Sequence, residues 1–264
     1  VFVGVGPLSR WKRTSSAYLV AQLSKVLFAS LVIGLVIPLI VLAEFSLAAT
    51  VTLILASWIV FAISKDIGNK IVNKRSKVDG LKALGLSYYG MVLAHIGIAV
   101  MLIGAALTSY FSEERSVLLR LGESVDLGGY VFTLQGSERI EGPNYIGDEA
   151  ELTVVKGDEL LTVLYPQRRL YVASGTPSTE MAIDAGFLRD LFVTLGEEKG
   201  AGAWSMTLYV KPFVRWIWLG AILMALGGTL ASADKRYRRL RVKAAEKSGV
   251  RSDALAAPEL QAAS

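Results

Sequence analysis

The sequence has 264 residues, of which 53% are hydrophobic, and its mean hydropathy is +0.47. This composition excludes an ordinary soluble protein and predicts an integral membrane protein, because the apolar residues are gathered in long blocks. The net charge of +5 does not indicate a nucleic-acid partner, since basic residues cluster beside those blocks. Cysteine is absent, so the chain supplies neither a disulfide nor a thiolate ligand.

Residues 1–25 predict the end of a preceding span followed by a basic cytoplasmic segment. The opening VFVGVGP is apolar, has no initiator Met and lacks the basic start and cleavage site of a signal peptide. It favours a C-terminal piece of a larger membrane protein. Arg10, Lys12 and Arg13 stand beside Trp11, a pattern typical of the cytoplasmic end of a span.

Residues 26–64 form an apolar region with one charged residue, Glu44. Because about 20 apolar residues cross a bilayer, the region predicts two spans, 26–43 and 45–64, joined in a hairpin with Glu44 near its tip. One long tilted helix is the alternative, but it would overshoot the hydrocarbon. Pro38 lies inside the first span, where neighbouring helices can satisfy the carbonyl that a kink frees.

Residues 65–87 predict a cytoplasmic loop. They contain six basic residues (Lys65, Lys70, Lys74, Arg75, Lys77 and Lys82) against two Asp. Such a charged run is ordinarily a solvated surface, and here it need only set the topology. The next apolar run, 88–110, therefore predicts a third span that runs outward.

This third span contains His95, the one histidine of the chain. An ionisable side chain within a span costs a few kcal/mol to insert, which makes His95 a candidate functional residue. The alternative is a neutral imidazole that hydrogen-bonds across a helix interface. His95 lies about 10 Å along the helix from Tyr88, on a smooth apolar face. That face suits a flat hydrophobic cofactor such as haem, but an apolar stripe at helical spacing is more often plain helix packing.

A strip of small residues borders His95. Gly90, Ala94, Gly97 and Gly104 recur at helical spacing, which predicts the close approach of another helix.

Residues 111–212 predict an inserted all-β domain outside the cytoplasm. Apolar and polar residues alternate in short segments separated by glycine-rich turns, as in Val117–Leu119–Leu121, Tyr130–Phe132–Leu134 and Trp204–Met206–Leu208–Val210. Such strands at about ten-residue spacing predict a small antiparallel barrel or sandwich. Between 111 and 211, sixteen acidic residues face nine basic ones, which is consistent with an outside location.

Residues 213–233 predict the fourth span, and 234–264 a basic cytoplasmic tail with a disordered end. Lys211, Arg215, Trp216 and Trp218 at the start of this span are typical of a membrane interface. Six Lys/Arg between 235 and 243 again indicate the cytoplasm. The basic segments and the acidic domain agree on one topology.

The usual enzyme motifs are missing from the sequence. It has no glycine-rich phosphate loop, no Cys/His metal cluster and no second histidine for a triad. The charged pairs Arg168–Arg169, Arg189–Asp190 and Glu197–Glu198 are more typical of solvated or structural residues than of catalysis. We therefore predict no catalytic residue.

Six segments, in order along residues 4–237, resemble the C-terminal half of the CcmF family of cytochrome c-type biogenesis proteins. They are GVGPLSRWKR, SYYGMVLAHIGIAV, GPNY, PQRRLYVASG, EMAIDAGFLRDLFVTLGE and AWSMTLYVKPFVRWIWLGAILMALGG. The AHIGIA and KPFVRWIWLG stretches are the most specific. Gln167 departs from the acid usual in the family at this position.

The resemblance implies a multi-pass protein of the bacterial inner membrane with its β-domain in the periplasm. The family is regarded as the haem lyase of system I, which helps attach haem to the CxxCH thiols of apocytochrome c. It holds a haem b between two transmembrane histidines, and one of them matches His95. The second ligand, two periplasmic histidines and a Trp-rich haem-handling segment belong to the N-terminal half. The fragment alone is therefore not expected to be active.

The implied partners are the N-terminal half of the same protein, apocytochrome c, and the periplasmic haem chaperone and thiol-reducing subunits. The expected function is the C-terminal part of a haem lyase subunit, in which His95 supports a haem b that reduces the incoming haem iron. The first alternative is a non-catalytic membrane scaffold whose β-domain docks periplasmic partners. The second is a haem or solute transporter, but apart from His95 these spans offer few of the mid-membrane polar groups that transporters use.

Overall fold

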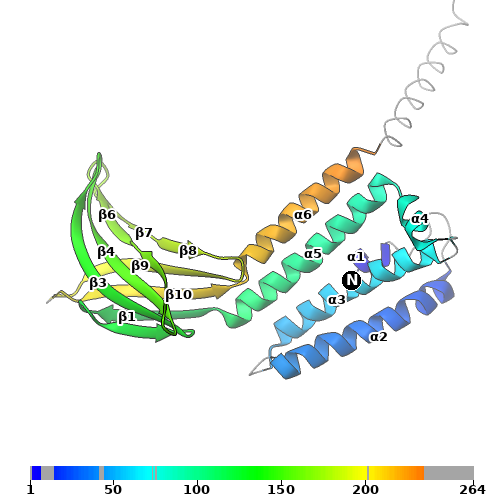
Figure 1. Ribbon diagram of the computed structural model, residues 1–264, viewed down its shortest axis with the longest axis horizontal. Helices are drawn as coiled ribbons and strands as arrows, with labels where there is room; N and C mark the ends of the chain where they lie inside the picture. The colour runs from blue at the N-terminus through cyan, green and yellow to red at the C-terminus, as the bar shows by residue number, and fades with distance from the viewer. Residues whose placement is uncertain are drawn as a thin grey trace, which may run out of the picture. The chain divides into compact units, whose positions relative to one another are not determined.

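The computed structural model describes residues 2–6, 15–41, 45–72, 74, 76–200 and 202–234 (Figure 1). Its helices are α1 (Phe2–Val5), α2 (Ser16–Val41), α3 (Leu47–Ile71), α4 (Lys77–Lys82), α5 (Leu86–Phe111) and α6 (Val214–Ser232). The predicted basic segment 10–13, Glu44 at the predicted hairpin tip, Arg75 and the basic tail after 234 lie outside the described residues.

Within this described part of the chain, four helices are long and apolar enough to cross a membrane. They are Ala17–Ile40 of α2, and α3, α5 and α6 over their full lengths. The four predicted spans are thus confirmed. Separate helices α2 and α3 occupy the region for which one long helix was the alternative. Ser46 caps the second of them, because Ala49 N donates to Ser46 Oγ at 3.3 Å.

Two of these helices extend beyond the predicted apolar runs, α2 at its N-terminal end and α3 at its C-terminal end. α2 begins ten residues before the predicted span, and α3 continues seven residues beyond it. These polar ends pack on each other: Lys65 Nζ donates to Gln22 O at 2.6 Å. Hydropathy marks the part of a helix that lies in lipid, whereas backbone hydrogen bonds and such contacts decide where the helix ends.

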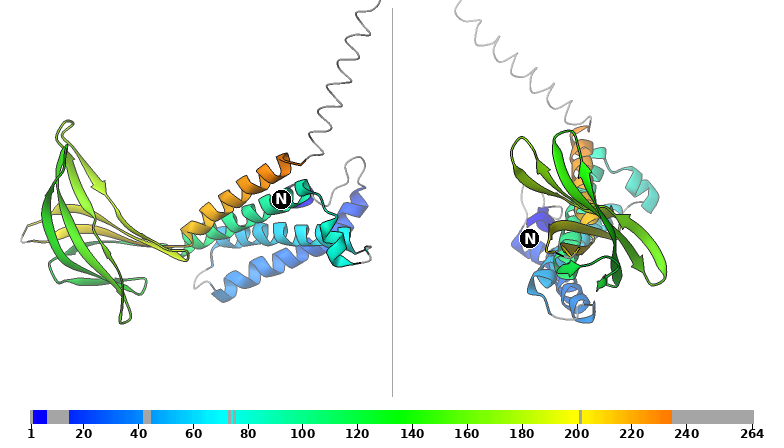
Figure 2. Two further views of the ribbon diagram at one scale, coloured as in Figure 1. Left: turned by 45° about the horizontal axis from the view of Figure 1, so that its top comes forward. Right: turned by 90° about the vertical axis from the view of Figure 1, so that its left-hand side faces the viewer.

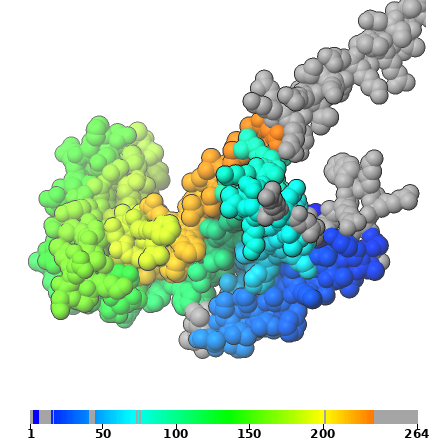
Figure 3. Space-filling model, turned by 45° about the vertical axis from the view of Figure 1, so that its right-hand side comes forward, coloured from blue at the N-terminus to red at the C-terminus, as the bar shows by residue number. Residues whose placement is uncertain are grey.

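Most of the surface of α2 is apolar and exposed. Phe28 is 70% and Ile40 78% exposed, and Pro38 is buried within the helix. Figure 3 shows α2, in the darker blues, at the surface of the protein. An apolar surface of this kind suits lipid or another membrane helix and does not suit water.

The strands between α5 and α6 form two antiparallel sheets, seen from two further directions in Figure 2. One has the order β1-β10-β9-β8, with β1 (Glu113–Leu119), β10 (Trp204–Pro212), β9 (Arg189–Glu198) and β8 (Ala182–Ala185). The other has the order β2-β3-β4-β6-β7, with β2 (Ser124–Leu127), β3 (Tyr130–Glu141), β4 (Tyr145–Lys156), β6 (Gln167–Tyr171) and β7 (Thr176–Glu180). β5 (Glu159–Leu164) pairs with the second half of β4.

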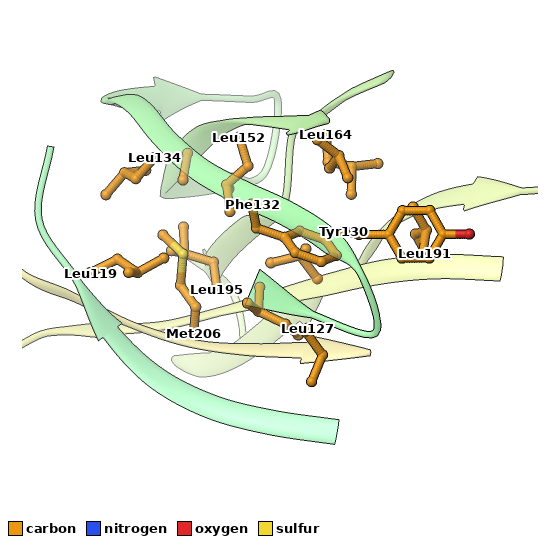
Figure 4. Packing of buried hydrophobic residues seen from close by; sticks show 14 of the residues in the cluster. Leu119, Leu127, Tyr130, Phe132, Leu134, Leu152, Leu164, Leu191, Leu195 and Met206 are labelled. Carbon is orange, nitrogen blue, oxygen red and sulfur yellow. The ribbon is translucent and has the colours of Figure 1, made fainter. Parts of the chain in front are cut away.

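The core of the β-domain lies between these sheets (Figure 4). Phe132 and Leu152 on one sheet and Leu195 and Leu208 on the other are all 0% exposed. Each such side chain contributes about 1.5–3 kcal/mol through its removal from water. The alternation predicted for β3 and β10 is confirmed, because every second residue of these segments is buried.

Leu121 was predicted to continue the buried alternation of the first strand, and this was wrong. β1 ends at Leu119, and Leu121 is 69% exposed. The chain turns here because Gly122 adopts a φ of +77°, which a residue with a side chain rarely adopts. Glu123 fastens the turn by accepting from Arg120 N at 2.8 Å.

The β-domain joins its two flanking helices at adjacent positions. Thr108 Oγ1 in α5 donates to Pro212 O, the last residue of β10, at 2.7 Å. Phe213 then turns the chain into α6 with a φ of +59°, a strained value for a residue with a side chain. Its N–H donates to Leu188 O at 2.9 Å, which stabilises this turn.

Candidate functional site

The small-residue strip of α5 packs directly on α6. A Cβ atom added to Gly90 would lie 2.5 Å from Gly227 O, and one added to Gly97 would lie 2.7 Å from Gly220 O. Both distances are far shorter than real Cβ contacts, so the two backbones touch. The two helices run side by side in Figures 1 and 2. The predicted close approach of another helix is confirmed, and that helix is α6.

His95 lies one residue beyond Ala94, which belongs to this strip. Its side chain is half-buried, and its Nδ1 lies 2.8 Å from Met91 O, one helical turn earlier. A carbonyl oxygen only accepts hydrogen bonds, so Nδ1 must be the protonated nitrogen. In a neutral imidazole the lone pair then stands on Nε2, which leaves this nitrogen able to bind a metal.

The neighbours of His95 on its own face are apolar. Ala99 is 1% exposed, while Met91, Val92 and Leu102 are half-buried. The hydrogen bond recorded for His95 runs within α5, whereas a histidine that joins helices would bond to a second helix. The geometry therefore fits a His95 ring that its own helix holds through Nδ1, while Nε2 is directed away from Met91.

A polar cluster fixes the N-terminal end of α5, two turns before His95. Tyr88 Oη donates to Asp66 Oδ2 at 2.7 Å, and Lys70 forms an ion pair with the same carboxylate. Lys70 Nζ also lies 4.8 Å from the centre of the Tyr88 ring. Asp66 is only 5% exposed, so this is a structural link between α3 and α5.

Sequence reasoning missed this cluster because it counted Asp66 and Lys70 as loop charges. The available signal was their spacing of four residues, which places an acid and a base on one face of a helix. A second link joins α5 to the end of α6, where Ser87 N donates to Asp234 Oδ2 at 3.0 Å.

Several charged residues of the β-domain form ion pairs with one another. Arg168 pairs with Glu197 at 3.2 Å, and Arg189 pairs with Asp184. The Lys199 ammonium, 2.9 Å from Glu197, lowers the pKa of that carboxyl below its ordinary value. Among the described residues, no three His, Cys, Asp or Glu side chains gather closely enough to hold a metal. The structural role predicted for these charges is consistent with this arrangement.

Residues 110–212 match the model of a protein family described as the CcmF C-terminal β-sandwich. Over 90% of its length, the chain is 45% identical to the cytochrome c-type biogenesis protein CcmF of Pseudomonas fluorescens. It is 39% identical to the CcmF of Escherichia coli K12 over the same share. The chain corresponds to the C-terminal part of CcmF.

In each of these CcmF relatives the match covers 36% of the protein, so the chain spans just over a third of their length. A solved structure entitled "Cytochrome c Heme Lyase CcmF" superposes with a TM-score of 0.70. That match is 24% identical in sequence and covers 87% of this chain and 37% of the solved one, and it shows the same fold. The CcmF fold thus accounts for both parts of the structure, the membrane helices and the β-sandwich.

Proposed function

We propose that this chain is the C-terminal part of a haem lyase subunit that attaches haem to apocytochrome c. Its relatives carry the name of cytochrome c-type biogenesis proteins, and the solved structure of the same fold is entitled a haem lyase. In this proposal His95 is one axial ligand of a haem b in the membrane. The second ligand comes from the part of the longer relatives that this chain does not span.

The single observation that supports the ligand role is the hydrogen bond between His95 Nδ1 and Met91 O. A ligating imidazole must be neutral and must present an unprotonated nitrogen, and an outer hydrogen bond to the other nitrogen commonly fixes both properties. The Met91 carbonyl does so here. It selects the tautomer with a free Nε2 and restricts rotation of the ring.

The surrounding helices position this ligand further. The backbone contact between Gly227 and Ala94 holds the residue before His95 against α6. The Asp66–Tyr88 hydrogen bond fixes the helix start two turns away. A haem bound at this place supplies one-electron chemistry, and its axial ligand and apolar surroundings set its potential.

The remaining parts of the proposal concern location and partners. The acid-rich β-domain faces the periplasm of a bacterial inner-membrane protein. There it contributes to the surface that receives apocytochrome c and meets the haem chaperone and thiol-reducing subunits. The excess of basic residues in 65–87 supports this topology, because short basic loops remain in the cytoplasm.

The test is His95→Ala in the full-length protein, purified from membranes and examined by absorption spectroscopy. We expect loss of the haem b Soret band and of cytochrome c maturation. Added imidazole should restore the band, which a purely structural histidine would not allow. Met91→Leu is the matched control, because it keeps the backbone carbonyl and should keep the spectrum.

An unchanged Soret band together with an unchanged yield of cytochrome c would contradict the ligand role. In that case the scaffold alternative predicts that His95→Gln is also nearly silent. It further predicts that disruption of the β-domain core, for example by Phe132→Asp, abolishes maturation.

A further inference from the structure

The turn between β8 and β9 carries two apolar side chains at its tip. β8 ends at Ala185 and β9 begins at Arg189, and between them Phe187 and Leu188 are 60% and 59% exposed. Turns that face water are normally built from small and polar residues. The adjacent exposure of a phenylalanine and a leucine therefore indicates contact with something other than water.

Three contacts fasten this turn to the start of α6. The ring of Phe187 lies 5.9 Å from the ring of Trp216. Leu188 O accepts from Phe213 N at 2.9 Å, directly before the helix begins. Directly after the turn, in β9, Asp190 Oδ1 lies 3.7 Å from Arg215 Nε in the first turn of α6. The tip of the turn is thus held beside the first turn of a membrane-spanning helix.

The length of α6 determines the depth of that first turn. The helix has 19 residues, which at 1.5 Å per residue gives about 28 Å. The hydrocarbon core of a bilayer is about 30 Å thick. Because the helix has no length to spare, residues 214–218 must lie at the membrane boundary. Phe187, which packs on Trp216, lies at the same boundary.

The chemistry around the turn is that of a membrane interface. Trp218 is 68% exposed on the first turns of α6, and the side chain of Arg215 is 49% exposed. Lys211 Nζ lies 5.4 Å from the centre of the Phe192 ring, at the end of β10. Indoles and cations on apolar stems are the groups that favour the lipid headgroup region. Lipid is therefore the surface that this combination fits.

We infer that the β8–β9 turn inserts Phe187 and Leu188 into the outer interface of the bilayer. The turn anchors the β-domain on the lipid surface, in addition to its two covalent links to α5 and α6. This inference requires only that α6 spans the membrane, and it is independent of the role of His95.

The absence of cysteine from the chain allows a direct test. Phe187→Cys, Leu188→Cys and the control Val172→Cys are each labelled with bimane, and the full chain is reconstituted into phosphatidylcholine vesicles. Val172 is 70% exposed in the β6–β7 turn, where its N–H donates to Asn144 O. It matches the test positions in exposure and apolar character, and it lies in a turn of the other sheet.

We expect lipids with brominated acyl chains to quench the labels at 187 and 188. Aqueous iodide should quench them several-fold less than the label at 172. Two test positions keep the experiment decisive if one substitution prevents folding. Iodide quenching at 187 and 188 equal to that at 172 would overturn the inference. Protection of both positions from iodide and from brominated lipid would also overturn it, and would show that protein covers the turn.

Discussion

Replacement of Gly227 by alanine is expected to force α5 and α6 apart. The new Cβ would lie 2.5 Å from Ala94 N and from Gly90 O, where ordinary contact begins at 3.4 Å. Both opposing atoms belong to the backbone and cannot rotate aside, so the helices themselves must move. Overpacking of this kind costs about 1–3 kcal/mol.

Gly228→Ala is the matched control, because it lies one residue further along the same helix. Its Cβ would meet nothing within 4 Å. Alanine favours a helix over glycine by about 1 kcal/mol, and this gain is common to both variants. The difference between their free energies of unfolding therefore isolates the collision, and we expect Gly227→Ala to be less stable than Gly228→Ala by the overpacking cost.

The assay is equilibrium unfolding of the full chain in mixed detergent micelles, followed by the loss of helical circular dichroism as the share of SDS rises. Equal unfolding midpoints for the two variants would refute the backbone contact between α5 and α6. If His95 ligates a haem as proposed, Gly227→Ala should also alter the haem spectrum of the full-length protein, because Ala94 precedes His95, whereas Gly228→Ala should not.

Three further predictions concern the rest of the structure. Leu152→Ala should lower the free energy of unfolding by about 2–5 kcal/mol in a urea titration, because the residue is fully buried. The control Leu160→Ala, at a 58% exposed position, should change this free energy by less than about 0.5 kcal/mol. Tyr88→Phe should cost about 1.5–3 kcal/mol in the SDS titration, because it removes one hydrogen bond to a buried carboxylate. Lys199→Ala should raise the pKa of Glu197 toward 4.5 in an NMR pH titration. In the parent chain that pKa is lowered, so the contact stabilises the fold above pH 4.5 and is lost as the pH falls through the lowered value.

Local periodicity was sufficient to predict much of this fold. The alternation in β10 identifies the buried face of a strand, because successive side chains point to opposite sides of a sheet. The apolar runs identify the spans in the same local way. Leu121 shows the limit of such reasoning, because the backbone conformation of Gly122 ends the strand and no hydropathy pattern records it.

Pairings between distant residues could not be predicted from one sequence. β4 pairs with β6 along its first half and with β5 along its second, an arrangement that depends on the whole domain. The Asp66–Tyr88 hydrogen bond also depends on how two helices, α3 and α5, pack together, which one sequence does not reveal. His95 could be identified from its rarity in a membrane span, but its tautomer required the Met91 carbonyl in space.

The chain enters and leaves the β-domain on neighbouring strands. β1 pairs with β10 along its whole length, and Glu113 lies opposite Val210. Paired strands lie about 5 Å apart. The points where the chain enters and leaves the domain are therefore close enough for a short peptide to connect them. The β-sandwich is therefore a modular insertion in a helical hairpin, and its outer loops can vary without any change in the spacing between α5 and α6.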